Sequence, residues 1–265
     1  MWVTNFQILD LFAVYNLVAQ IEKRRMHTLG HQMAKNLSTI GFDADDTLWH
    51  NERFFRMTQE RFVELLADFA PREHLEAKML DAEKRNLGRY GFGVKGFVLS
   101  MIETAIEVTQ ERVPASVIAE LIAAGHDMLS YPIELLPHVR ETVESCAQSH
   151  RILLITKGDL LDQERKLAQS GLGELFDGVE IVSNKTPASY HEIFNRHGEG
   201  AARSMMVGNS MKSDVLPAIE AGSWGIYVPH GEPWELERAD PPTGHTRFQE
   251  LPSLETLADV VALIG

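Results

Sequence analysis

The feature that most constrains the fold is an alternation, in the second half of the chain, of short apolar runs with segments of helical length. Strand-like runs are predicted at residues 37–42, 151–155, 179–182, 204–207 and 224–228. From the second run onward, helices are predicted between the strands, near residues 160–170, 188–196 and 212–221. Strands that alternate with helices predict an α/β fold with a parallel sheet.

The segment between the first and second strands differs from the rest, because its roughly hundred residues contain no convincing strand. Its apolar periodicity predicts helices near residues 52–69, 72–87, 95–110 and 114–125. Gly88, Gly91, Gly93 and Gly96 predict a loop within this segment, either a sharp bend that approaches a ligand or an ordinary connector. The chain is therefore predicted to carry a helical insert after its first strand.

The first 36 residues precede the predicted fold. Their apolar stretch is interrupted by polar residues, so it does not predict a membrane span, and its basic residues follow it, which is the wrong order for an export signal. Two interpretations stay open: an amphipathic helix that docks on a neighbour, or a misplaced start codon with translation beginning at Met33.

Charge and cysteine content exclude several functions. Lys and Arg number 25 against 38 Asp and Glu, a formal net charge of −13, so nucleic acid is not an expected partner, and no membrane partner is expected either. The single cysteine, Cys146, cannot form an internal disulfide or a Cys-based zinc site, which favours a cytoplasmic location and a buried, inert thiol. Oligomeric state is not predicted. His191, His197 and His230 show no metal-binding spacing and are expected on the surface or in loops.

Three carboxylates follow the first predicted strand, in the run Asp43-Ala-Asp45-Asp46-Thr47. Ligands of open α/β sheets bind at the carboxyl ends of strands. Alternation along an extended chain places Asp43 and Asp45 on the same side, where two anions require a cation or a shared proton.

Other strand ends carry complementary groups. Thr156 ends the second strand, Lys185 follows the third, and the fourth is followed by Gly208-Asn209-Ser-Met-Lys-Ser-Asp214. Each signal alone is weak, since Thr156 could cap a helix and Lys185 could be a solvated surface charge. Taken jointly and in this order along the chain, the four strand-end motifs form a specific pattern.

This set of motifs resembles that of the haloacid dehalogenase superfamily of hydrolases, over residues 37 to about 230. The resemblance implies a Rossmann-like parallel core, residues 37–50 and 136–265, with a helical cap domain of the C1 type inserted at residues 51–135. It also implies that the cap closes over the site and sets substrate specificity.

The resemblance implies a role for each matching residue. Asp43 would be the nucleophile that forms an aspartyl-phosphate, and Asp45 the general acid and base. Thr156 and Lys185 would bind the phosphoryl oxygens. Mg²⁺ would be held by Asp43, Asp45 through its backbone carbonyl, Asp214 and Asn209, and charge counting agrees, because three carboxylates and a phosphate dianion require Mg²⁺ and Lys185 for balance.

Two positions depart from the family pattern. Asn209 stands where Asp is common and removes one negative charge from the expected metal site, and Asp46 stands where Gly is common and receives no catalytic role. Trp49, Phe54, Phe55 and Phe62 are expected to pack in a core, although Trp49 and Asn51 lie beside the motif and are candidates to line the cleft.

The resulting prediction is a Mg²⁺-dependent phosphatase that acts on a small phosphorylated metabolite. Same-fold alternatives are a 2-haloacid dehalogenase, disfavoured because that branch lacks the second aspartate, and a sugar-phosphate mutase, which the motifs barely separate from a phosphatase. A catalytically silent binding protein is the alternative from another class, and it predicts eroded motifs. The leaving group is not predicted by the sequence.

Overall fold

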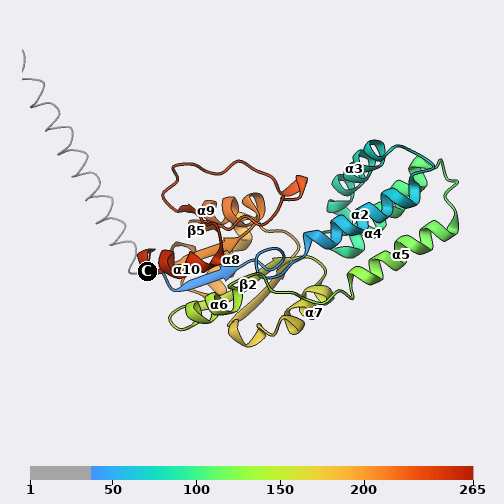
Figure 1. The fold of residues 1–265 in the computed structure, drawn as a ribbon. Helices are drawn as coiled ribbons and strands as arrows, with labels where there is room; N and C mark the ends of the chain where they lie inside the picture. Colours follow the sequence, from blue (N-terminus) through green and yellow to red (C-terminus); the bar gives the residue numbers. More distant parts are fainter. Residues whose placement is uncertain (1–36, 265) are drawn as a thin grey trace, which may run out of the picture.

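A computed structural model of the chain describes residues 37–264, so the predicted N-terminal extension lies outside the described residues. The described residues form a sheet of six parallel strands in the order β3-β2-β1-β4-β5-β6 (Figure 1). The strands are β1 (Thr39–Phe42), β2 (Arg151–Lys157), β3 (Gly178–Val182), β4 (Ser204–Gly208), β5 (Trp224–Tyr227) and β6 (Phe248–Glu250). The parallel α/β prediction is confirmed. β6 was not predicted, because its three residues follow a Pro-rich stretch without strand-like periodicity.

Both faces of the sheet are covered, and the strand residues alternate between them. Ile152 and Leu154 of β2 belong to an apolar cluster completed by α6 (Val139–Ala147) and α10 (Leu257–Ile264). Leu153 and Ile155 belong to the cluster on the other face, which α8 (Pro187–His197) and α9 (Leu216–Glu220) complete. Burial on both faces explains why these strands read as continuous apolar runs rather than as alternating ones.

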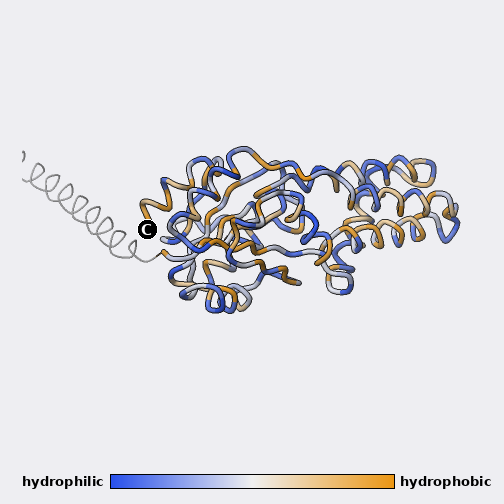
Figure 2. Tube along the Cα trace, turned by 90° about the horizontal axis from the view of Figure 1, so that it is seen from below, coloured by the Kyte–Doolittle hydropathy of each residue, from blue (hydrophilic) through white to orange (hydrophobic). Residues whose placement is uncertain are grey.

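The predicted helical insert contains α2 (Glu52–Leu66), α3 (Arg72–Tyr90), α4 (Val94–Val108) and α5 (Ala115–Met128). These helices lie at the end of the molecule away from the C-terminus (Figure 1) and pack around an apolar core of their own. Figure 2 shows the apolar stretches of these helices in orange. The predicted glycine loop is shorter than expected, because Gly88 lies within α3 and Gly96 within α4. Gly96 is required there, because a Cβ atom would lie 2.9 Å from the Gly91 carbonyl oxygen.

The two chain segments that join the insert to the core run side by side. His50 donates its backbone N–H to the Glu134 carbonyl at 3.1 Å, and Leu136 donates to Leu48 at 2.9 Å. Trp49 and Leu135 form the β-bridge between these bonds. The insert therefore begins and ends next to the carboxyl end of β1, where the predicted catalytic residues lie.

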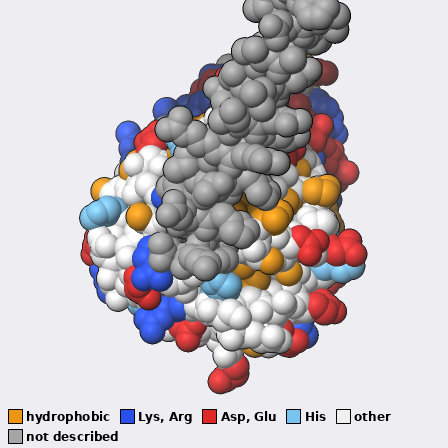
Figure 3. Space-filling view, turned by 90° about the vertical axis from the view of Figure 1, so that its left-hand side faces the viewer, with side chains coloured by type: hydrophobic (Ala, Val, Ile, Leu, Met, Phe, Trp, Pro, Cys, Tyr) orange, Lys and Arg blue, Asp and Glu red, His pale blue; other side chains and the backbone are white. Residues whose placement is uncertain are grey.

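On the uncovered part of the face in Figure 3, Lys and Arg side chains lie among Asp and Glu side chains. No helix within residues 37–264 combines the length and the apolar character needed to cross a membrane.

Candidate active site

Three charged residues from separate strand ends meet in a buried cluster. Asp43 directly follows β1, Lys185 lies between β3 and α8, and Asp214 lies in a π-helical turn after β4. The Lys185 Nζ donates to Asp43, and it donates to the Asp214 Oδ1 at 2.7 Å. The side chains of Lys185 and Asp214 are 1% exposed and that of Asp43 is 9% exposed. The structure thus brings together three of the predicted site residues.

Local backbone geometry allows the Asp214 carboxylate to reach this position. A Cβ atom on Gly208 would lie 2.3 Å from the Asp214 Oδ2, so only glycine permits the approach. The same oxygen accepts the backbone N–H of Ser210 at 2.9 Å. The π-helical turn, Met211–Val215, is an irregularity that often occurs at functional sites.

The cluster changes the protonation equilibria of its members. Burial and the neighbouring Asp214 raise the pKa of Asp43 to about 7, although Lys185 opposes this. Burial alone would lower the pKa of Lys185, but Asp214 and Asp43 outweigh it and raise the pKa overall. The cluster therefore contains two carboxyl groups and one lysine, and its positive charge does not neutralise both carboxylates when both are ionised.

Threonine and amide groups surround Asp43. The Thr47 hydroxyl donates to the Asp43 Oδ2 at 3.0 Å and accepts the backbone N–H of Asn209 at 3.0 Å. Thr156 is 1% exposed and lines the same cavity from the end of β2. Asn209 lines the cavity as well, so each predicted phosphate- and metal-binding residue lies at the carboxyl edge of the sheet.

Asp45 lines the cavity but turns toward α7 (Leu160–Ser170). Its carboxylate accepts bonds from the Gln163 amide at 2.7 Å, the Trp49 indole at 2.8 Å and the Lys166 Nζ at 3.0 Å. Among the carboxylates that raise the pKa of Asp43, Asp214 has the larger effect and Asp45 the smaller. Asp43 therefore shares its lysine with Asp214, whereas Asp45 pairs with Lys166, an arrangement that alternation within one strand does not predict.

Asp46 has a structural function. Its φ of 59° lies in the left-handed region, where glycine is favoured. Its two carboxylate oxygens accept the backbone N–H groups of Asn51 at 2.9 Å and Glu52 at 2.8 Å, at the start of α2. Asp46 thus satisfies donors at the N-terminus of the first insert helix.

A second group of metal-compatible side chains lies beside the cavity. Ligand atoms of Asp46, His50 and His230 lie within 4.8 Å of one another, and the two imidazole rings are 5.2 Å apart. Imidazole and carboxylate suit zinc and other transition ions, unlike the oxygen donors around Asp43. His230 is in a loop, as predicted, but it lines the cavity.

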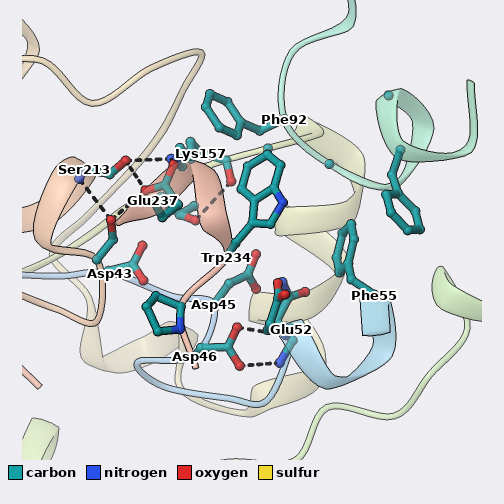
Figure 4. Close-up of a pocket in the computed structure, with 18 of the residues that line it drawn as sticks. Asp43, Asp45, Asp46, Glu52, Phe55, Phe92, Lys157, Ser213, Trp234 and Glu237 are labelled. Carbon is teal, nitrogen blue, oxygen red and sulfur yellow. Dashed lines mark hydrogen bonds and ion pairs between the residues drawn. The ribbon is translucent and has the colours of Figure 1, made fainter. Parts of the chain in front are cut away.

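The segment after β5 forms part of the site, and we call residues 228–238 the β5 loop. Its Glu237 accepts bonds from the Lys157 Nζ at 2.6 Å, the Ser210 hydroxyl at 2.6 Å and the Ser213 hydroxyl (Figure 4). The Lys157 Nζ also lies 3.9 Å from the centre of the Phe92 ring, which belongs to the insert. The β5 loop, the core and the insert therefore meet around one cavity.

The cavity has a volume of about 180 Å³ and opens between the sheet edge and the insert. Phe55 lines it, whereas Phe62 packs in the core of the insert and Phe54 stacks on Tyr131, 4.4 Å between ring centres. The core-packing prediction therefore holds for Phe62 and Trp49, and Phe55 both packs against the core of the insert and lines the cavity, whereas Phe54 is half-buried outside these cores. Trp49 is fully buried, and Asn51 lines the cavity and accepts from Lys166 at 2.8 Å.

Several residues of the site were missed by sequence reasoning. They are Lys157, Gln163, Lys166, Phe92, Trp234 and Glu237. The polar positions 162, 163 and 166 on one face of α7 were a usable signal, because that face is buried despite its polarity. The irregular β5 loop offers no periodicity from which the places of Trp234 and Glu237 could be inferred. Cys146 is buried, and burial raises the pKa of its thiol to about 11, which confirms its interpretation as an inert core residue.

The fold and this geometry define a hydrolase of known type. Residues 37–222 match the haloacid dehalogenase-like hydrolase family, and the chain therefore belongs to that family.

Individual relatives agree with this assignment. The chain is 26% identical over 212 residues to a glyceraldehyde 3-phosphate phosphatase of Methanothermobacter thermautotrophicus, which covers 76% of this chain and 89% of that protein. A haloacid dehalogenase-like family hydrolase from Xanthomonas campestris has a crystal structure that is 38% identical, with a TM-score of 0.76 over 86% of this chain and 92% of that one. An L-2-haloacid dehalogenase from Xanthobacter autotrophicus shares the fold, at 16% identity and a TM-score of 0.59 over 85% of this chain and 98% of that one.

Proposed function

We propose that the protein is a Mg²⁺-dependent phosphatase that hydrolyses a phosphate monoester of a small metabolite through an Asp43 aspartyl-phosphate. The observation that carries this proposal is the buried cluster of Asp43, Lys185 and Asp214 at the head of a cavity that Thr156 also lines. A carboxylate nucleophile beside a fixed ammonium group suits attack on a phosphorus atom whose oxygens carry negative charge.

The similarity to a glyceraldehyde 3-phosphate phosphatase supports phosphate esters as the substrate class, and the cavity volume of about 180 Å³ suits a small metabolite. The solved dehalogenase structures are less than 25% identical to this chain, so they support the fold and not the activity. Within this sequence, the second aspartate, Asp45, favours phosphoryl transfer, because it supplies an acid for the leaving oxygen.

In the proposed reaction, an Asp43 oxygen forms a bond to phosphorus while the bond from phosphorus to the ester oxygen breaks. Asp45 donates a proton to the departing oxygen and then removes one from the water that attacks the aspartyl-phosphate. Phosphate leaves and the Asp43 carboxylate is restored. Lys185 and Thr156 hold the phosphoryl oxygens throughout. Gln163, Lys166 and Trp49 hold the Asp45 carboxylate in place.

The residues at the carboxyl ends of the strands fit Mg²⁺. Asp43 and Asp214 supply buried carboxylate oxygens, and Asn209 and the Asp45 backbone carbonyl complete a set of hard oxygen donors. Burial and the Asp214 carboxylate raise the pKa of Asp43, and one lysine stands against the two carboxylates. When bound, Mg²⁺ would supply the positive charge that lets a phosphate dianion approach these carboxylates.

The test is phosphate release from a generic aryl phosphate, with and without Mg²⁺, by the wild-type protein and its Asp43→Asn variant. We expect release that requires Mg²⁺ and is lost in the variant. Chloride release from a 2-haloacid is measured in parallel, and chloride without phosphate would establish the dehalogenase alternative. Return of the phosphoryl group to a sugar phosphate instead of water would establish the mutase. Silence in all three assays would favour a binding protein. The cytoplasm remains the expected compartment, on the basis of the single cysteine.

A further inference from the structure

The charges that line the cavity are strongly unbalanced. Among the described lining residues, nine carboxylates face three lysines. Each lysine is already paired with carboxylate: Lys157 with Glu237, Lys166 with Asp45 and Asp162, and Lys185 with Asp43 and Asp214. A leaving group with its own negative charge would therefore find no spare lysine among these residues.

Two of the carboxylates, Glu52 of α2 and Glu83 of α3, line the part of the cavity formed by the insert. Burial raises the pKa of both to about 7, with a contribution from Asp46 to Glu52 and from Glu52 to Glu83. Glu52 lies 3.6 Å from the half-exposed Arg56. The carboxylate of Glu83 accepts a hydrogen bond from the Trp234 indole, and within residues 37–264 no Lys or Arg forms an ion pair with it.

An unsatisfied acceptor lies one turn further along α3. Asn86 is 2% exposed and lines the cavity, and its Nδ2 donates to the Ser100 hydroxyl at 3.1 Å and to Glu103 at 2.9 Å. Its Oδ1 is buried and has no hydrogen-bond partner. Buried polar atoms are rarely left without a partner, so an unpartnered acceptor beside Glu83 indicates a missing donor.

Aromatic side chains surround these acceptors. Phe55 and Phe97 of the insert contact each other edge to face at 4.9 Å, and Phe92 contacts Trp234 of the β5 loop at 6.3 Å. Figure 4 shows the Trp234 indole between Phe92 and Glu52. Aromatic faces bind ammonium groups, as the Lys157 Nζ over the Phe92 ring shows within this cavity.

We propose that the natural substrate is a phosphate ester whose leaving alcohol carries a positively charged nitrogen, bound by Glu83, Glu52 and Asn86 and enclosed by the aromatic side chains. This inference rests on the proposed phosphatase function and names its substrate class, an aminoalkyl phosphate. The ammonium group supplies the positive charge that Glu83 lacks and a donor for the Asn86 oxygen. The phosphoryl group is then directed toward Lys185 and Asp43.

The test compares three esters of equal length: 2-aminoethyl phosphate, 2-hydroxyethyl phosphate and phosphoglycolate. We expect kcat/KM to be at least tenfold higher for the amine than for the hydroxyl ester, with the carboxylate ester the poorest. Equal or higher kcat/KM for the hydroxyl ester would overturn the inference, even with the phosphatase function intact.

The variant Glu83→Gln removes the charge and keeps the shape of the side chain. We expect the ratio of kcat/KM for the amine to the hydroxyl ester to fall at least tenfold, mainly through KM. The matched control is Glu73→Gln, an exposed residue of the same helix outside the cavity, for which the ratio is expected to stay constant. An unchanged ratio in Glu83→Gln would refute the assignment.

A binding measurement separates this inference from the function on which it rests. Calorimetry with ethylammonium, which carries N–H donors, is expected to show binding to the wild-type protein and at least tenfold weaker binding to Glu83→Gln. Hydrolysis of aryl phosphate without ammonium binding overturns the inference alone. Absence of phosphate release from every ester, the aryl phosphate included, overturns both the function and the substrate class derived from it.

Discussion

The two ends of the cavity differ in how their charges are matched. At the carboxyl ends of the strands, Asp43 and Asp214 share Lys185, the Thr47 hydroxyl donates to Asp43 and the Ser210 backbone N–H donates to Asp214. At the insert end, Glu83 has no cationic partner within the described chain and the Asn86 oxygen accepts no bond. The carboxylates at the strand ends thus share a buried lysine, whereas Glu83 in the insert has no such partner and would be neutralised by the substrate that we propose.

The physical origin of this difference is the scaffold. Strand ends are held by the sheet's backbone hydrogen bonds, so their side chains meet in a reproducible geometry. The insert is a separate helical core joined to the sheet through two adjacent segments near Trp49 and Leu135. Its cavity-lining residues can therefore differ without disturbing the sheet. The following predictions test whether the two ends are separable in this way.

The largest effect is expected for Asp43→Asn. Loss of the nucleophile should lower kcat on an aryl phosphate by about 10³-fold or more, as for other residues that form the reacting bond. Steady-state assays with excess Mg²⁺ measure this, with Asp81→Asn on the exposed surface of α3 as the control. Turnover near the wild-type rate in Asp43→Asn would remove the sheet edge from the mechanism altogether.

A large effect on stability is expected for Lys185→Met. Removing the lysine leaves two buried carboxylates without their counter-ion, which typically costs about 3–5 kcal/mol of unfolding free energy. Urea denaturation at pH 7 measures this loss, and the exposed Lys84→Met provides the control. A loss smaller than that of the control would show that the sheet-edge cluster does not depend on this ion pair.

A medium effect is expected at Asp46, which joins the two ends. Asp46→Gly removes the bonds to the Asn51 and Glu52 amides but tolerates the positive φ, and should cost about 1 kcal/mol. Asp46→Ala loses the same bonds and keeps a Cβ atom in the left-handed region, which alanine tolerates less well than aspartate, and should cost about 2 kcal/mol in total. Thermal or urea unfolding of both variants measures the difference. Equal losses would show that the left-handed backbone carries no strain.

The smallest effect is expected for Glu83→Gln, and it depends on pH. Folding raises the pKa of Glu83 from an ordinary 4.5 to about 7, so the folded protein keeps a proton that the unfolded chain releases in this window. Wild-type stability therefore falls as pH rises from 4.5 to 7, whereas glutamine has no proton to lose.

Because Glu83 is only partly buried, solvent screening reduces the effect, and we expect Glu83→Gln to be about 1 kcal/mol more stable than wild type at pH 8.5 and equal to it at pH 4.5. Urea denaturation at both pH values measures this, and Asp81→Asn should show no such change. A constant difference between wild type and Glu83→Gln at the two pH values would contradict an uncompensated charge in the insert.

Much of the fold and part of the site could be predicted from residue patterns. The five longer strands, the helical insert and the positions of Asp43, Thr156, Lys185 and Asp214 at the sheet edge follow from local periodicity and strand-end chemistry. The short strand β6 could not be predicted, because its three residues show no periodicity. The extent of the glycine loop could not be predicted either, because α3 and α4 both continue into the glycine-rich region.

The sequence by itself determined the parallel α/β architecture and the proposed reacting groups, because sheet topology brings the carboxyl ends of parallel strands together. Only the tertiary structure decided that Asp43 shares Lys185 with Asp214 while Asp45 pairs with Lys166, and that Trp234 and Glu237 complete the cavity. It also brought Glu52, Glu83 and Asn86 to one wall. These contacts join residues far apart along the chain, through an irregular loop and a packed helical insert, and neither has a period that the sequence could reveal.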